Sequence, residues 1–62
     1  MKHWYFEVVT KNSMYEGEEF LVEAKDKRQA QHLAEYYFPN EKIRCYGTVS
    51  EIEAERMGLD EY

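Results

Sequence analysis

The sequence predicts an α+β fold of the order β-β-α-β-α: a three-stranded antiparallel sheet with one long helix packed on one face and a short C-terminal helix. Three observations lead to this prediction. Residues 26–38 form a capped amphipathic segment, a capping box begins at Ser50, and three segments rich in aromatic and β-branched residues occupy 4–10, 18–24 and 42–49. Residues 1–62 are expected to form one domain, because so short a chain has room for a single core.

The long helix is expected over residues 26–38, DKRQAQHLAEYYF. Its apolar residues recur at i, i+3, i+4 and i+7 and form one stripe: Ala30, Leu33, Ala34 and Tyr37. Asp26 is the expected N-cap, since its carboxylate can accept from the free amides of the first turn, and Gln29 can reach back to the Asp26 amide. Pro39 ends the helix, because it has no N–H and disfavours a helical conformation in the residue before it.

The three strand segments predict alternating faces. The positions expected to face the helix are Trp4, Phe6, Val8, Thr10, Phe20, Val22, Ala24, Ile43, Cys45, Gly47 and Val49. A glycine inside a strand, here Gly47, is typical of a β-bulge or of a close approach by another element. We expect the third strand to pair with the first, which gives the order 2-1-3 and puts the most hydrophobic strand in the centre.

The C-terminal helix is predicted over residues 51–57 by signals at both of its ends. Ser50 with Glu53 three residues later is a capping box, and Gly58 lies where a left-handed residue ends a helix. Residues 60–62 carry no pattern, so we expect them to fray.

A helix on only one face of the sheet leaves the other face open. The alternation places on that face Tyr5, Val9, Leu21 and Tyr46, with Arg44 beside them. Apolar side chains gathered on an open sheet usually form an interface. We therefore interpret the chain as a non-catalytic protein–protein interaction module, which binds a protein partner or a second copy of itself as a homodimer. An exposed surface without a role is the plainer interpretation, and stacking of nucleic-acid bases on the two tyrosines is a third.

The charge of the chain argues against nucleic acid. The formal net charge is −5, and residues 32–62 hold three basic against seven acidic residues, a balance of −4. Such a surface repels phosphate groups. The alternative function is therefore an acidic inhibitor that imitates nucleic acid and binds a basic nucleic-acid-binding protein, with Glu51, Glu53 and Glu55 as its acidic surface. Capping and solubility explain the same charges without such a role.

No motif for catalysis, a cofactor or a structural metal occurs in the sequence. Cys45 is the single cysteine, and no zinc-type spacing or phosphate-binding glycine loop is present. Met1-Lys2-His3 matches the tripeptide spacing that binds Cu(II) or Ni(II), but any unstructured terminus with this spacing does so. We expect no enzymatic activity, no cofactor and no metal.

The chain also lacks the apolar run of a signal peptide and the ~20 apolar residues of a membrane span. With its lone cysteine, this predicts a cytoplasmic protein without membrane attachment. A short, acidic, aromatic chain of this kind is typical of accessory proteins of bacteria and their mobile elements.

Overall fold

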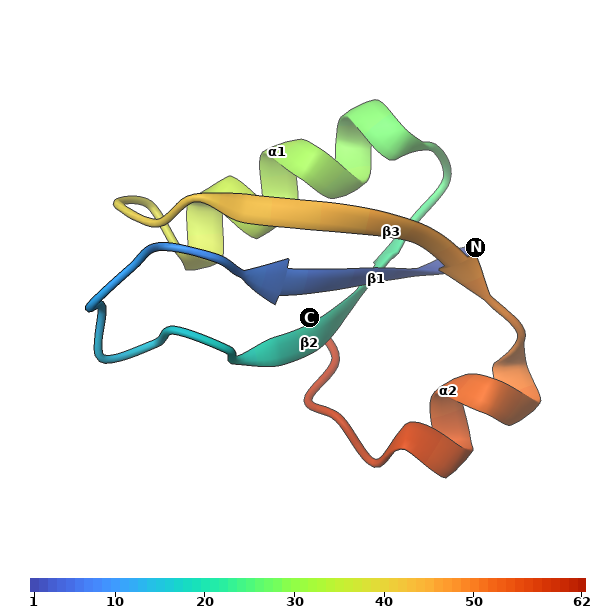
Figure 1. Cartoon of the computed structure of the whole chain (residues 1–62). Coiled ribbons are helices and arrows are strands. Elements are labelled where there is room, and N and C mark those ends of the chain that lie inside the picture. The colour runs from blue at the N-terminus through green and yellow to red at the C-terminus, as the bar shows by residue number, and fades with distance from the viewer.

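The computed structural model describes all 62 residues and contains five elements in the expected order. They are β1 (Lys2–Val8), β2 (Glu19–Ala24), α1 (Lys27–Tyr37), β3 (Ile43–Val49) and α2 (Glu51–Met57). The strands form an antiparallel sheet in the order β2-β1-β3 (Figure 1). The predicted α+β fold and its strand order are therefore confirmed.

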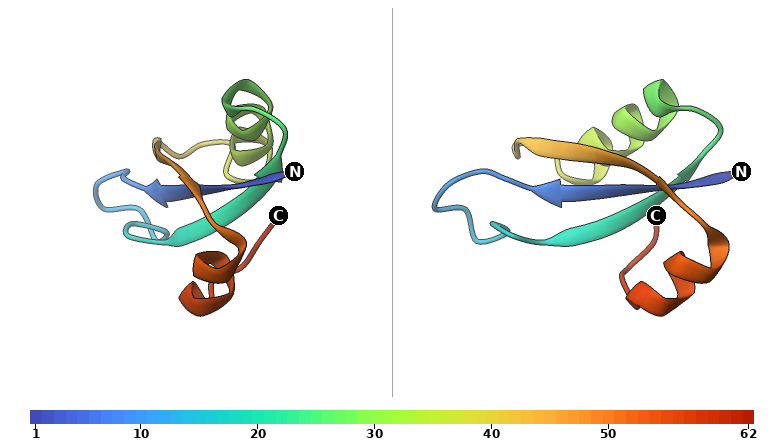
Figure 2. Two further views of the ribbon diagram at one scale, coloured as in Figure 1. Left: turned by 90° about the vertical axis from the view of Figure 1, so that its right-hand side faces the viewer. Right: turned by 45° about the vertical axis from the view of Figure 1, so that its right-hand side comes forward.

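The two helices lie on opposite sides of the sheet, with α1 covering one face and α2 set off from the other beyond the end of β3 (Figure 2). At the start of α1, the Asp26 carboxylate accepts the backbone N–H of Gln29 at 2.8 Å, as predicted. The side chain of Gln29 reaches one residue further than predicted, because it accepts the backbone N–H of Lys25 at 2.8 Å. The helix ends at Tyr37 with Phe38 as its C-cap, immediately before Pro39.

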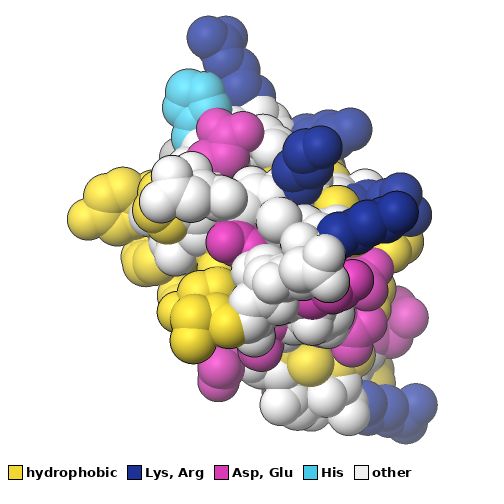
Figure 3. Space-filling view, turned by 60° about the vertical axis from the view of Figure 1, so that its left-hand side comes forward, with side chains coloured by type: hydrophobic (Ala, Val, Ile, Leu, Met, Phe, Trp, Pro, Cys, Tyr) yellow, Lys and Arg dark blue, Asp and Glu magenta, His cyan; other side chains and the backbone are white.

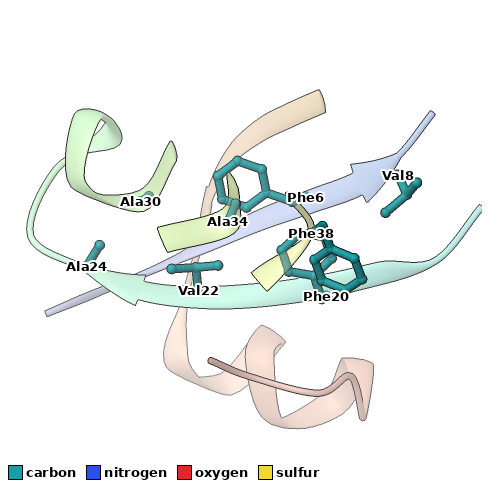
Figure 4. Packing of buried hydrophobic residues seen from close by; sticks show 8 residues of the cluster. All are labelled: Phe6, Val8, Phe20, Val22, Ala24, Ala30, Ala34 and Phe38. Atoms are coloured by element: carbon teal, nitrogen blue, oxygen red, sulfur yellow. The ribbon is translucent and has the colours of Figure 1, made fainter. Parts of the chain in front are cut away.

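The hydrophobic core lies between α1 and the sheet (Figure 4). Phe20 is its central ring and stacks on Phe6 and on Phe38, with centroid distances of 5.5 and 4.5 Å. The helix contributes two fully buried alanines, Ala30 and Ala34, whose small side chains allow it to lie close to the strands. The remaining buried members are Val8, Val22 and Ala24, and Trp4, Leu33, Ile43 and Cys45 pack against them.

Gly47 forms the predicted β-bulge. Its φ of +106° is one that residues with a side chain rarely adopt. The register with β1 shifts here, because Tyr5 pairs with Gly47 while Phe6 pairs with Cys45, which leaves Tyr46 without a partner. A Cβ at Gly47 would meet no atom within 4 Å, so the alternative of a close approach by another element does not apply.

The bulge reverses the sides of the sheet on which the last residues of β3 lie. Beyond it, Trp4 pairs with Thr48 and His3 pairs with Val49. Because paired residues project to the same side of a sheet, Thr48 lies on the side of α1 and Val49 lies on the opposite side. The prediction that Val49 faces the core is wrong, since one extra residue in a strand inverts the alternation that follows it.

The C-terminal residues pair with the outer edge of β2 rather than fraying. The N–H of Leu21 donates to the carbonyl of Asp60 at 2.9 Å, and the N–H of Tyr62 donates to the carbonyl of Leu21 at 2.8 Å. The bridge is parallel, so the chain returns from α2 to run alongside β2 (Figure 1). The prediction that residues 60–62 fray is wrong, because the free edge of β2 supplies partners for their backbone groups.

Candidate functional site

The sheet face turned away from α1 has two stacked tyrosines at its centre. The rings of Tyr5 and Tyr46 have centroids 5.0 Å apart and planes inclined by 28°. Tyr5 comes from β1 and Tyr46 from β3, and the bulge beside Gly47 places the two side by side. Tyr46 is half-exposed and Tyr5 is partly exposed, so the pair presents an aromatic surface to solvent.

Hydrogen bonds across the strands fix both tyrosines. The hydroxyl of Tyr5 donates to Glu19 on β2, and that of Tyr46 donates to Glu7 on β1. The bond to Glu19, followed by burial, raises the pKa of Tyr5 to about 12. The bond to Glu7 and burial also raise the pKa of Tyr46, although Arg44 partly opposes them. Both tyrosines are therefore neutral donors near pH 7.

The tyrosine pair lies among carboxylates. Glu7 and Glu19 are directly opposite each other across β1 and β2, an arrangement that is destabilising for like charges. Each glutamate accepts one tyrosine hydroxyl, which offsets part of this repulsion. Arg44, paired with Glu7 on the β3 side, brings a positive charge to the same face. We call the set Tyr5, Tyr46, Glu7, Glu19 and Arg44 the tyrosine face.

The five residues predicted for the open face have different positions in the structure. Tyr5, Tyr46 and Arg44 lie on the tyrosine face. Val9 lies just beyond the end of β1 and is partly exposed, with its N–H donated to the carbonyl of Lys42 at 2.8 Å. Leu21 lies on the expected side, opposite Tyr5, but is only 1% exposed. The prediction that Leu21 is exposed is wrong, because the chain from α2 to Tyr62 runs on that side and pairs with β2 at this residue.

The acidic residues predicted on α2 do not form one row. Glu53 completes the capping box, since its carboxylate accepts the backbone N–H of Ser50 while the Ser50 hydroxyl accepts the backbone N–H of Glu53, each at 3.1 Å. Glu51 and Glu55 are exposed and lie one turn apart on a different side of the helix. Two carboxylates of α2, rather than three, therefore share a surface.

The imidazole of His3 is bound to the C-terminal segment. Its Nδ1 contacts the carboxylate of Glu61, and this hydrogen bond is the largest cause of the raised pKa of His3, which burial partly opposes. The ring that would contribute to a Met1-Lys2-His3 metal site is thus engaged within the fold, and Lys2 already belongs to β1. No group of three or more His, Cys, Asp or Glu side chains is arranged to hold a metal ion.

A hollow of about 560 Å³, which was not predicted from the sequence, lies at the C-terminal end of α1. Its aromatic lining consists of Tyr15, Tyr37, Phe38 and Tyr62. These residues come from the loop after β1, from α1 and from the end of the chain. No short stretch of sequence contains the pattern. The one local signal is Tyr15, a large aromatic residue within a turn segment.

Neither helix has the length and apolar character needed to cross a membrane. Comparison of the chain with protein families, with curated proteins and with solved structures found no match.

Proposed function

We propose that the protein is a non-catalytic interaction module whose tyrosine face binds a basic segment of a partner protein. The observation that supports this most directly is the exposed Tyr5–Tyr46 stack, fixed by hydrogen bonds to Glu7 and Glu19. Tyrosine is enriched at protein interfaces, because its ring offers a large contact area at the cost of ordering few torsions. Here both rings are already oriented, so binding loses little side-chain entropy.

The charges around the stack favour a basic partner. A lysine or arginine placed between Glu7 and Glu19 would relieve their mutual repulsion and could also lie over a tyrosine ring. The net charge of −5 further attracts a basic segment over longer distances. Arg44 gives the face one position for a carboxylate or a backbone carbonyl of the partner.

Self-association as a homodimer is the competing proposal for the same face. It is less well supported, because the burial of Leu21 removes the largest aliphatic side chain from the exposed surface. Two copies meeting through this face would also bring together the Glu7 and Glu19 carboxylates of both chains. A stable symmetric dimer normally buries a more apolar surface than this one.

The acidic-inhibitor proposal is weaker for a geometric reason. Imitation of nucleic-acid phosphates requires carboxylates in a row, and only Glu51 and Glu55 share a side of α2. Binding by that route depends on these two residues and not on the tyrosine stack, which separates it from the first proposal.

The test is selection of binding peptides from a random display library, followed by measurement of each Kd. We expect the selected peptides to be rich in arginine and lysine, and Tyr46→Ala to weaken their binding at least about tenfold, as for a central interface tyrosine. Tyr36→Ala is the matched control, because Tyr36 is an exposed tyrosine on α1, away from this face.

Three outcomes would contradict the proposal. One is a selection that does not enrich peptides in arginine and lysine. Another is a set of selected peptides that bind wild type and Tyr46→Ala equally well. The third is a salt-resistant dimer by light scattering that Tyr46→Ala dissociates, which would assign the face to self-association.

A further inference from the structure

The hollow at the C-terminal end of α1 has the geometry of an aromatic box. The rings of Tyr15 and Tyr62 both stand nearly perpendicular to that of Phe38, at 82° and 89° and with centroid distances of 5.7 and 6.0 Å. The ring of Tyr37 lies against that of Tyr62, with their centroids 4.5 Å apart. Phe38 is 9% exposed, whereas the three tyrosines are 39–45% exposed. Phe38 therefore forms the floor of the hollow, and the tyrosines form its walls.

The charged side chains that line the hollow are all acidic. They are Glu18, Glu41 and Asp60. Burial is the largest cause of the raised pKa of Tyr62, and the negative charges of Asp60 and Glu18 add to it. Figure 3 looks toward this end of the molecule: hydrophobic side chains gather at the left of the view with carboxylates beside them, while Lys and Arg project at the top and along the right.

Hydrogen bonds within the protein hold the walls of the hollow in place, so their arrangement does not depend on a ligand. The hydroxyl of Ser13 donates to the carboxylate of Glu41 at 2.5 Å and accepts the backbone N–H of Tyr15 at 3.1 Å. This serine joins the loop after β1 to the turn after α1. On the other side, the backbone of Tyr62 is paired with β2. A site built in this way needs little ordering when it binds.

We propose that this hollow binds a quaternary ammonium group. Tyrosine rings attract such a cation through the negative potential of their faces, and a group that carries methyls in place of N–H donors loses little when water is excluded. The three carboxylates at the hollow attract the positive charge. The volume of about 560 Å³ lies within the usual range for a small-molecule site. The hollow shares no residue with the tyrosine face, so the two proposals fail independently.

The first experiment is an NMR titration of the ¹⁵N-labelled protein with choline chloride and with its neutral isostere, 3,3-dimethylbutan-1-ol. We expect saturable shifts of the Tyr37, Phe38 and Tyr62 amides with a choline Kd on the order of 1 mM, and binding of the neutral alcohol at least about fivefold weaker. A third titration, with the amide of N-acetyl-trimethyllysine, distinguishes the source of the group. Tighter binding of this compound indicates a methylated protein side chain, and tighter binding of choline indicates a free small molecule.

Variants test which residues make the site. Tyr37→Ala should weaken choline binding by roughly fivefold, as expected for loss of one ring from such a site. Glu18→Gln changes an exposed carboxylate that accepts no side-chain hydrogen bond, so it tests the charge even if the tyrosine variant fails to fold. Tyr46→Ala is the matched control on the other face and should leave the Kd unchanged.

The proposal is overturned by any of three results. They are the absence of saturable shifts at about ten times the expected Kd, equal binding of choline and the neutral alcohol, and equal loss of binding in Tyr46→Ala and Tyr37→Ala.

Discussion

The backbone N–H of Tyr62 donates to the carbonyl of Leu21 at 2.8 Å, and this bond connects the two surfaces to which we assign functions. The same pairing forms a parallel bridge along the edge of β2 that would otherwise be open. Leu21, at which the segment pairs, is buried on the sheet face turned away from α1, and the ring of Tyr62 lines the aromatic hollow. Three C-terminal residues without any strand pattern therefore shape both candidate sites.

Deletion of residues 60–62 should destabilise the protein by about 3 kcal/mol, because it exposes the Leu21 side chain and removes backbone hydrogen bonds from β2. The free energy of unfolding is measured by urea denaturation. Leu21→Ala should cost less in the shortened chain than in the full chain, since the leucine is already exposed there. Equal costs in both chains would show that these residues do not cover Leu21.

The contact between His3 and Glu61 should make the docking of the C-terminal segment depend on pH. The folded pKa of His3 is raised. The stability that this bond contributes is therefore fully present below the unfolded pKa of about 6.5 and is lost as the pH rises through the folded value. We expect the difference in unfolding free energy between wild type and Glu61→Gln to be larger at about pH 5.5 than at about pH 9.

The control for this pH dependence is His32→Gln, which changes an exposed histidine on α1. When Glu61→Gln is compared with its parent in a chain that carries His32→Gln, the difference in unfolding free energy should still be larger at low pH than at high pH. If wild type and Glu61→Gln differ in unfolding free energy by the same amount at both pH values, His3 and Glu61 are not bound to each other in solution.

Gly47→Ala should destabilise the fold by about 1–2 kcal/mol, because an L-residue is strained at a φ of +106°. A Cβ at this position meets no atom within 4 Å, so the cost is one of backbone conformation and not of collision. A chain of 62 residues is accessible to chemical synthesis, which allows D-alanine at position 47 as the matched comparison. D-alanine favours positive φ and should be neutral or slightly stabilising. Equal destabilisation by both alanines would contradict this explanation.

The elements of the fold were predictable because their signals are local. Asp26 before the long helix, Pro39 after it and the Ser50–Glu53 capping box each determine an end of a helix through neighbouring residues. The bulge at Gly47 was predictable for the same reason. Its consequence for Val49 was not, because the face of that residue depends on which strand pairs across the bulge and in which register.

The features missed from the sequence depend on contacts between distant residues. The bond between Leu21 and Tyr62 joins backbone groups, which are the same in every residue and leave no trace in the sequence. The aromatic hollow has walls from the first loop, from α1 and from the C-terminus. Tyr37 illustrates the difficulty: its spacing places it on the apolar stripe of α1, yet it is 44% exposed and lines the hollow.

The hydrogen bond between Tyr5 and Glu19 should appear as an alkaline titration. The pKa of Tyr5 is raised to about 12. The stability that this group contributes is therefore fully present below its unfolded pKa of about 10 and is lost as the pH rises towards the folded value. Spectrophotometric titration of tyrosinate, with the curve of Tyr5→Phe subtracted, isolates this residue. Glu19→Gln should move the pKa of Tyr5 back towards 10, because the hydrogen bond to Glu19 is the largest cause of the shift and the charge of Glu19 adds to it.

This titration also bears on the proposed function, because the bond to Glu19 orients Tyr5 against Tyr46. A pKa near 10 in the wild-type protein would mean that the bond does not persist in solution. The ring of Tyr5 would then be free to rotate, and a partner would lose affinity by having to order it on binding. If the pKa is raised and Glu19→Gln lowers it, the same variant should weaken peptide binding through both the lost charge and the lost orientation. Tyr5→Phe retains the ring and the charge of Glu19 while removing the hydroxyl, so its effect on the peptide Kd measures the orientation alone.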